Sequence, residues 1–163
     1  MDEGEENGAQ TSAYEKRNLK GYKGTQLPSH GIKVFILNSY FDSLDEYNFT
    51  DKEEYQVTKF VVQINKNGFV NLEGRNKQSN DPDSDKPCYL EKVTFANEHK
   101  LFHYHIGVGH YAGPFGDKTS EFVVHYSYCQ LEKAASIISV APHPPFNLPT
   151  TEELESGINT IHE

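Results

Sequence analysis

The stretch HKLFHYHIGVGHY, residues 99–111, carries four histidines, which are His99, His103, His105 and His110. A neutral imidazole binds transition metals. An imidazole that titrates near neutral pH can also accept or donate a proton during catalysis. This concentration of histidine therefore points to either a metal site or an acid–base site.

Two segments of alternating apolar residues must position these side chains. In residues 101–108 the apolar side chains alternate with His103 and His105, and in residues 121–128 they alternate with Glu121, Val123, His125 and Ser127. Successive side chains of a strand point to opposite faces of a sheet. If the apolar sides share a core, all three histidines lie on the opposite face, away from that core.

A third strand is predicted at residues 135–142, with His143 just past its end. The HxH spacing of His103 and His105 puts two imidazoles on one side, and His125 could be a third metal ligand. However, the chain has no second HxH, no HExxH and no nearby cysteine pair. We therefore expect neither a metal nor another cofactor.

Acid–base chemistry suits the same face. RNA cleavage by attack of a 2′-hydroxyl needs a group that takes the hydroxyl proton, a group that protonates the leaving oxygen, and a cation beside the phosphate. The expected catalytic residues are His103, His105 and His125. Basic, aromatic and histidine side chains nearby are expected to bind substrate. These are Arg75, Lys77, Tyr111, Lys118 and His143.

The clearest helix is predicted from the sequence NFTDKEEYQVTKFVVQINKNG. Thr50 is its predicted N-cap, and Glu53 three residues later completes a capping box. Apolar residues at i, i+3, i+4 and i+7 form one face, and Gly68 ends the helix. The face consists of Val57, Phe60, Val61 and Ile64. A short apolar run at 32–40 predicts a buried strand before it.

The remaining segments complete an α+β prediction. Residues 1–28 are expected to be a flexible arm, and residues 74–87 a long exposed loop. A single domain spans residues 29–149. Residues 150–163 form an acidic tail that can make a short helix capped by Thr150 or Thr151. The predicted fold is an antiparallel sheet of about four strands with a helix packed on one face.

The net charge of -9 is distributed unevenly along the 163 residues. Residues 1–16 and 150–163 carry -4 each, which leaves -1 for residues 17–149. A polyanionic partner is therefore neither favoured nor excluded. No run approaches the roughly 18 apolar residues of a membrane helix, and the N-terminus is acidic where a secretion signal is basic. We expect a cytoplasmic protein without a membrane partner.

The order of elements, with the stretches GFVNLEGRNK, LFHYHIG, TSEFVVHY and IISVAPHPPF, resembles the RelE/ParE superfamily of bacterial toxins. The resemblance covers about residues 32–148 and is closest to the YafO-like toxins. It implies a small α+β fold and a metal-independent endonuclease that cuts mRNA on the ribosome and is silenced by a cognate antitoxin. Gly74 and Arg75 match a segment before the sheet, and His103 to Gly107 match a histidine-bearing strand.

Three hypotheses follow. The first is a toxin-type endoribonuclease in which His103 or His105 exchanges protons together with His125, while Arg75 and Lys118 support the phosphate. The second is a non-catalytic acidic partner, an antitoxin or immunity protein, that covers a basic toxin. The third is a zinc-dependent hydrolase. The acidic composition departs from the basic character usual in RelE-type nucleases, which is why the second hypothesis is retained.

Overall fold

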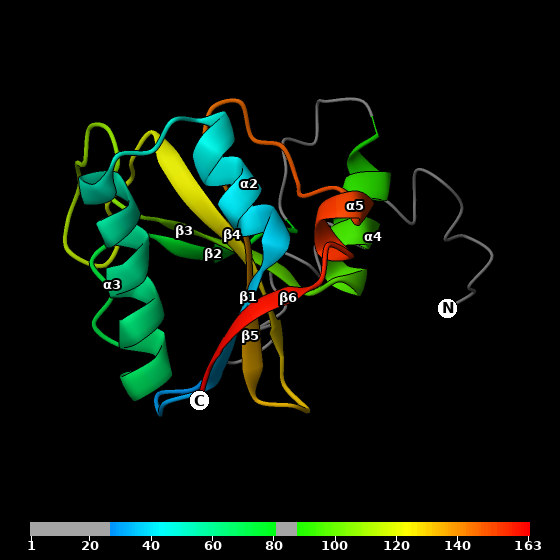
Figure 1. Ribbon diagram of the computed structural model, residues 1–163. Helices are drawn as coiled ribbons and strands as arrows, with labels where there is room; N and C mark the ends of the chain where they lie inside the picture. Colours follow the sequence, from blue (N-terminus) through cyan, green and yellow to red (C-terminus); the bar gives the residue numbers. More distant parts are fainter. Residues whose placement is uncertain (1–26, 81–87) are drawn as a thin grey trace, which may run out of the picture.

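The computed structural model describes residues 27–80 and 88–163. The expected arm at residues 1–28 therefore lies almost wholly outside the described residues, as does the 81–87 part of the expected loop. The helices and strands follow in the order drawn in Figure 1. They are β1 (Lys33–Leu37), α2 (Asn38–Glu46), α3 (Asp51–Asn67), β2 (Asn76–Gln78), α4 (Tyr89–Glu98), β3 (Leu101–His105), β4 (Phe122–Cys129), β5 (Ala134–Pro142), α5 (Thr151–Leu154) and β6 (Ile158–His162).

The strands form one sheet in the order β2-β3-β4-β5-β1-β6. Neighbouring strands are antiparallel except β1 and β5, which pair in parallel. The α+β class is confirmed, but the expectation of about four antiparallel strands is wrong. The described sheet has six strands, because β2 and β6 add an edge strand at each side. It is mixed, because β1 pairs in parallel with β5.

Helix α3 follows the sequence prediction closely. The Thr50 hydroxyl accepts a hydrogen bond from the Glu53 backbone N–H at 3.2 Å, and the Glu53 carboxylate accepts one from the Thr50 N–H at 2.9 Å. Val57, Phe60 and Val61, together with Ile64, are buried. Gly68 ends the helix with a φ of +74°, where an added Cβ would collide with the carbonyl oxygens of Pro28 and His30.

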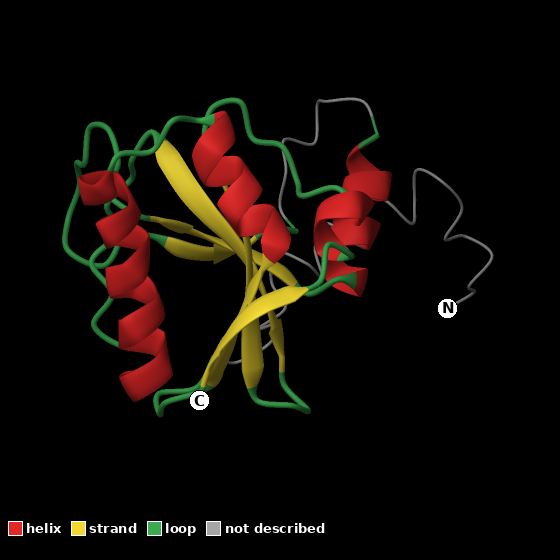
Figure 2. Cartoon of the chain, viewed as in Figure 1, coloured by secondary structure: helices red, strands yellow, loops and turns green. Residues whose placement is uncertain are grey.

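Helices cover both faces of the sheet, whereas one covered face was expected (Figure 2). One core joins α2 and α3 to Phe102, Tyr104, Val124 and other apolar residues of the strands. A smaller cluster on the opposite face joins α4 to the sheet through Ala96, Leu101 and Ile138, with Leu37. We call the first face the α3 face and the second the histidine face, because the latter carries His103, His105 and His125.

Three other expectations need correction. Residues 38–40, assigned to the strand at 32–40, begin α2 instead. Residues 76–78, assigned to the exposed loop at 74–87, form β2 and pair with β3. The acidic tail contains the expected short helix α5, with Thr150 as its N-cap, but the chain then returns as β6 beside β1. Strands β2 and β6 form by pairing with segments distant in sequence, so the periodicity of their own residues did not predict them.

None of the helices within residues 27–80 and 88–163 is long and apolar enough to cross a lipid bilayer.

Candidate active site

The register of the sheet places polar side chains in a row across the histidine face. Lys77 of β2 pairs with His103 of β3, which pairs with His125 of β4, which pairs with Ser139 of β5. Directly paired residues point to the same face of a sheet. His105, two positions after His103, therefore lies on this face as well. The predicted convergence of the three strand histidines is confirmed.

The segment after β5 returns over this row. The ring centroid of His143 lies 5.6 Å from that of His103 and 5.3 Å from that of His105. Phe146 packs against His103 at 4.8 Å and against His143 at 4.9 Å. His143, expected only as a substrate-binding residue, is thus part of the histidine cluster, which we define as His103, His105, His125 and His143.

The covering segment buries the strand histidines. His103 is 5% exposed, His105 4% and His125 1%. The prediction that they lie away from the main apolar core is right, because that core is on the α3 face. They nevertheless sit in a packed layer, so substitution of His103 and His125 by alanine would open cavities instead of leaving the fold untouched.

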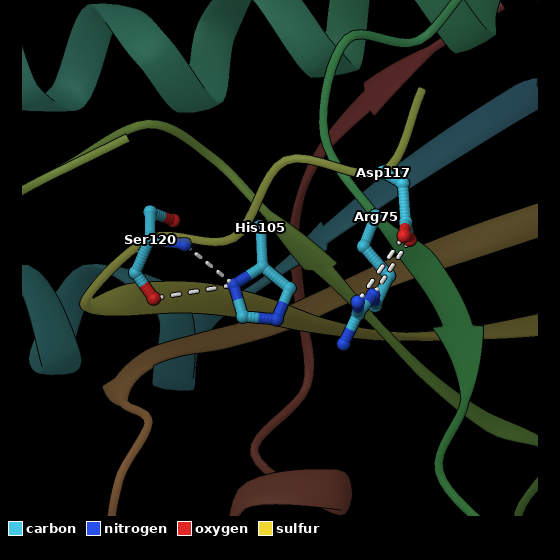
Figure 3. Close-up of polar contacts among 4 residues, drawn as sticks. All are labelled: Arg75, His105, Asp117 and Ser120. Atoms are coloured by element: carbon cyan, nitrogen blue, oxygen red, sulfur yellow. Dashed lines mark hydrogen bonds and ion pairs between the residues drawn. The ribbon is translucent and has the colours of Figure 1, made fainter. Parts of the chain in front are cut away.

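His105 has backbone partners for either state of its Nδ1 atom. The Ser120 N–H donates to Nδ1 at 2.9 Å, and the Ser120 carbonyl oxygen lies 3.2 Å from the same nitrogen (Figure 3). An unprotonated Nδ1 accepts from the amide, and a protonated Nδ1 can donate to the carbonyl. In His103 the Nδ1 atom lies 2.9 Å from Ser79 Oγ, a hydroxyl that can also donate or accept.

Burial keeps the cluster neutral. It lowers the pKa of His103 to about 2, an effect that the neighbouring histidines strengthen. Burial also lowers the pKa of His105 and of His125 to about 4 each. The pKa of the half-buried His143 is lowered by burial and by the positive charges of Arg75 and Lys77. A neutral imidazole has a free lone pair at pH 7, so each ring is available to a proton or to a metal ion.

His125 has an unusual environment. Its Nδ1 and Nε2 atoms are both buried, and neither has a hydrogen-bond partner within the described part of the chain. Its ring lies 6.3 Å from His103 and 5.8 Å from Phe146, measured between centroids. A buried polar group without a partner lowers the free energy of unfolding by about 1–3 kcal/mol. A histidine at this position therefore does not serve stability. Complete burial also makes His125 a poor choice for proton exchange with a substrate, in contrast to its expected catalytic role.

Two cations lie at the rim of the histidine face. Arg75 Nε donates to Asp117 Oδ1 at 2.7 Å and Arg75 Nη2 to Asp117 Oδ2 at 3.2 Å. This ion pair stands beside the His105 ring in Figure 3, with the arginine side chain partly exposed. Lys77 is next to His103 across the strands. Two of the three predicted cations, Arg75 and Lys77, are therefore brought to the cluster.

Lys118 and Tyr111 lie elsewhere. Lys118 Nζ donates to Glu73 Oε2 at 2.6 Å and lies 5.3 Å from the centre of the Tyr111 ring. Tyr111 lines a hollow of about 330 Å³ together with Phe60 of α3, on the other side of the sheet. The structure does not join these two residues to the histidine cluster, because their side chains point toward the α3 face.

Sequence reasoning missed several residues of this site. Ser79, Ser120, Asp117 and Phe146 contact the cluster or its cation, and none was given a role from the sequence. Helix α4 was also missed, although Tyr89, Val93 and Ala96 at i, i+4 and i+7 are buried and carry a helical signal. The serines contact histidines 15 and 24 positions away, so only the tertiary structure identifies them.

The cluster can therefore exchange protons beside a cation or hold a metal ion. Comparison of the chain with protein-family models, with curated proteins and with solved structures finds no match.

Proposed function

We propose that the protein is an endoribonuclease that cleaves RNA by attack of a 2′-hydroxyl, with histidines as the proton-transfer groups and without a metal. The observation that carries this proposal is the position of His105. Its Nδ1 atom has both a donor and an acceptor on Ser120, so the ring is held in place in either protonation state. The Arg75 guanidinium beside it can bind a phosphate by two hydrogen bonds.

His105 is the proposed base. Its pKa of about 4 makes it neutral at pH 7, ready to take the proton of the attacking hydroxyl. When Nδ1 carries the proton and donates to the Ser120 carbonyl oxygen, the Nε2 lone pair is left for the substrate. Removal of that proton, attack on phosphorus and departure of the 5′-oxygen give a cyclic phosphate and a free 5′-hydroxyl.

His143 is the proposed acid that protonates the leaving 5′-oxygen. It is less buried than the strand histidines, and its ring lies 5.3 Å from that of His105. Its pKa is lowered by Arg75 and Lys77 as well as by burial. A phosphate bound at these cations would offset their charge and raise the pKa of His143 toward the range where it carries a proton.

The resemblance of residues 32–148 to RelE/ParE toxins favours mRNA on the ribosome as the substrate and a cognate antitoxin as the partner. In this proposal the protein is the toxin of such a pair. His103 and Lys77 then line the site, while Lys118 and Tyr111 have no direct part in it.

The test uses the full chain, stripped of transition metals with dipicolinate and dialysed. The protein is added to a reconstituted translation mix and to the same mRNA without ribosomes, and RNA ends are mapped by primer extension. The proposal expects cuts that require ribosomes. Matched variants are His105→Asn, expected to cleave about 10²–10⁴-fold more slowly, and His110→Asn, an exposed histidine expected to be neutral.

Intact RNA in both mixes would overturn the nuclease proposal. Growth of cells that express the chain alone provides an independent reading. A toxin slows growth, whereas an antitoxin or immunity protein does not. Intact RNA together with normal growth would favour the acidic binding partner, which a pull-down would then pursue among basic proteins.

A further inference from the structure

Three histidines of the cluster lie close enough together to form a small metal site once their rings move closer. His103, His105 and His143 each offer a ring nitrogen, and these three atoms lie within 4.8 Å of one another. They come from β3 and from the segment after β5, so the tertiary structure assembles the set. Imidazole donors without carboxylates suit zinc, copper and nickel and disfavour calcium and magnesium.

The surroundings orient the ligands as metal sites do. A metal-binding histidine generally donates its second ring N–H to an oxygen, which fixes the ring. Here Ser79 Oγ lies 2.9 Å from Nδ1 of His103, and the Ser120 carbonyl oxygen lies 3.2 Å from Nδ1 of His105. In both rings this leaves the Nε2 atom for a metal ion.

His125 supplies an independent observation. It is 1% exposed, and within residues 27–80 and 88–163 neither ring nitrogen has a hydrogen-bond partner. Its ring is the cross-strand neighbour of His103, at 6.3 Å. Zinc held by three protein ligands keeps water on its fourth position. Such a water would offer His125 the partner that the described residues do not supply.

We propose that His103, His105 and His143 bind one Zn²⁺ ion, and that the zinc-bound form is inactive as a nuclease. Zinc occupies the Nε2 lone pair of His105 and a ring-nitrogen lone pair of His143, and these histidines therefore cannot exchange protons with RNA. Tetrahedral ligands at about 2.0–2.1 Å from zinc are about 3.3 Å apart. The rings must therefore close in, and His143, which follows β5, can move without breaking a strand. The inhibition rests on the proposed nuclease function, whereas the binding of zinc does not.

The first experiment measures binding without activity. Cobalt(II) is added to the metal-stripped full chain, because tetrahedral cobalt absorbs strongly in the visible region, and zinc is then titrated by calorimetry. The wild type is expected to show this absorption, its loss when zinc is added, and a 1:1 stoichiometry. His143→Asn should weaken zinc binding at least 100-fold, since it removes a ligand from a half-buried position and leaves the strands intact.

His110→Asn and His99→Asn are the matched controls, because both histidines are exposed and lie outside the cluster. They should bind zinc as the wild type does. Circular dichroism of all variants checks that they are folded. No tetrahedral cobalt spectrum, or binding that survives in His143→Asn but falls in a control, would overturn the site and assign the metal to surface histidines.

The second experiment separates this inference from the nuclease proposal by comparing RNA cleavage by stripped and zinc-loaded protein. Cleavage by the stripped form that stops at one equivalent of zinc supports both. Zinc binding with no cleavage in either form overturns the nuclease and the inhibition, and leaves the metal site standing. Cleavage only by the zinc-loaded form overturns the metal-independent mechanism and the inhibition. Equal cleavage by both forms overturns the inhibition alone.

Discussion

The Nδ1 atom of His105 is held by a single residue, Ser120, whose backbone N–H donates to it at 2.9 Å and whose carbonyl oxygen lies 3.2 Å from it. A backbone partner of this kind cannot be removed by substitution of the serine side chain. It keeps the imidazole in one orientation while the proton count on the ring changes. That property suits a proton-transfer group, and it also suits a metal ligand.

Substitution of His105 by asparagine is expected to lower the rate of RNA cleavage by about 10²–10⁴-fold, the usual contribution of a general base. Single-turnover cleavage of a defined mRNA on ribosomes measures the rate. Ser120→Ala is the matched control, because it removes the hydroxyl and retains both backbone partners of His105. Cleavage that persists in His105→Asn would reassign the base, and His103 would be the next residue to test.

Substitution of Arg75 by alanine is expected to abolish detectable cleavage with little loss of stability. The pair between Arg75 and Asp117 is largely exposed, and such pairs contribute at most about 1 kcal/mol. Lys118→Ala is the control, since Lys118 lies on the α3 face and its removal should leave cleavage within about twofold of the wild-type rate. Thermal melts and cleavage assays are compared for both variants. A larger effect in Lys118→Ala than in Arg75→Ala would contradict the assignment of the phosphate-binding cation.

The stability of the protein is expected to fall as the pH falls below about 6.5, the usual pKa of an unfolded histidine. The pKa of His105 and of His125 is lowered to about 4 in the folded chain, so unfolding takes up protons between these values. Within this window, each such histidine lowers the free energy of unfolding by up to about 1.4 kcal/mol for every unit by which the pH falls. Above about pH 6.5 the histidine is neutral in both states, and the full stability is present. Urea unfolding between pH 7.5 and 5 measures the slope. A flat profile would show that these histidines titrate in the folded chain at the same pH as in the unfolded chain.

Substitution of His125 by leucine is expected to maintain or raise the free energy of unfolding at pH 7. The substitution removes a buried imidazole that has no partner within the described residues and replaces it with an apolar side chain. Unfolding of the variant should also take up one proton fewer between about pH 6.5 and about 4, so its free energy of unfolding should depend less steeply on pH. Urea unfolding of metal-stripped protein at pH 7 and pH 5.5 tests both effects. A loss of several kcal/mol at pH 7 would indicate that His125 is satisfied by a group outside residues 27–80 and 88–163.

Substitution of Thr50 by alanine is expected to cost about 1 kcal/mol of stability, because it removes the side-chain cap of the 17-residue helix α3. Thr150→Ala removes the same kind of capping box from α5, which has four residues, none of them buried. The second loss should therefore be smaller. Chemical denaturation of the two variants under the same conditions provides the comparison, and equal losses would contradict it.

The sequence by itself determined the elements whose signals are local. The cap at Thr50, the apolar face of α3 and the stop at Gly68 lie within one continuous segment, and the structure has all three. Alternation in β3 and β4 likewise predicts His103, His105 and His125 on one face, because successive side chains of a strand point to opposite faces of the sheet. Gly74 and Arg75 directly precede β2, and Arg75 reaches the histidine face beside His105.

The tertiary structure decided what depends on residues distant in the chain. Strand register set His103 opposite His125, and the segment after β5 brought Phe146 over both rings and His143 over His103 and His105. That cover buries rings expected to lie off the core, and burial in turn lowers their pKa values. Parallel pairing of β1 with β5 and the turn of Lys118 toward Glu73 are equally non-local. Such contacts are made across the sheet, where the periodicity of a single segment carries no information about its neighbour.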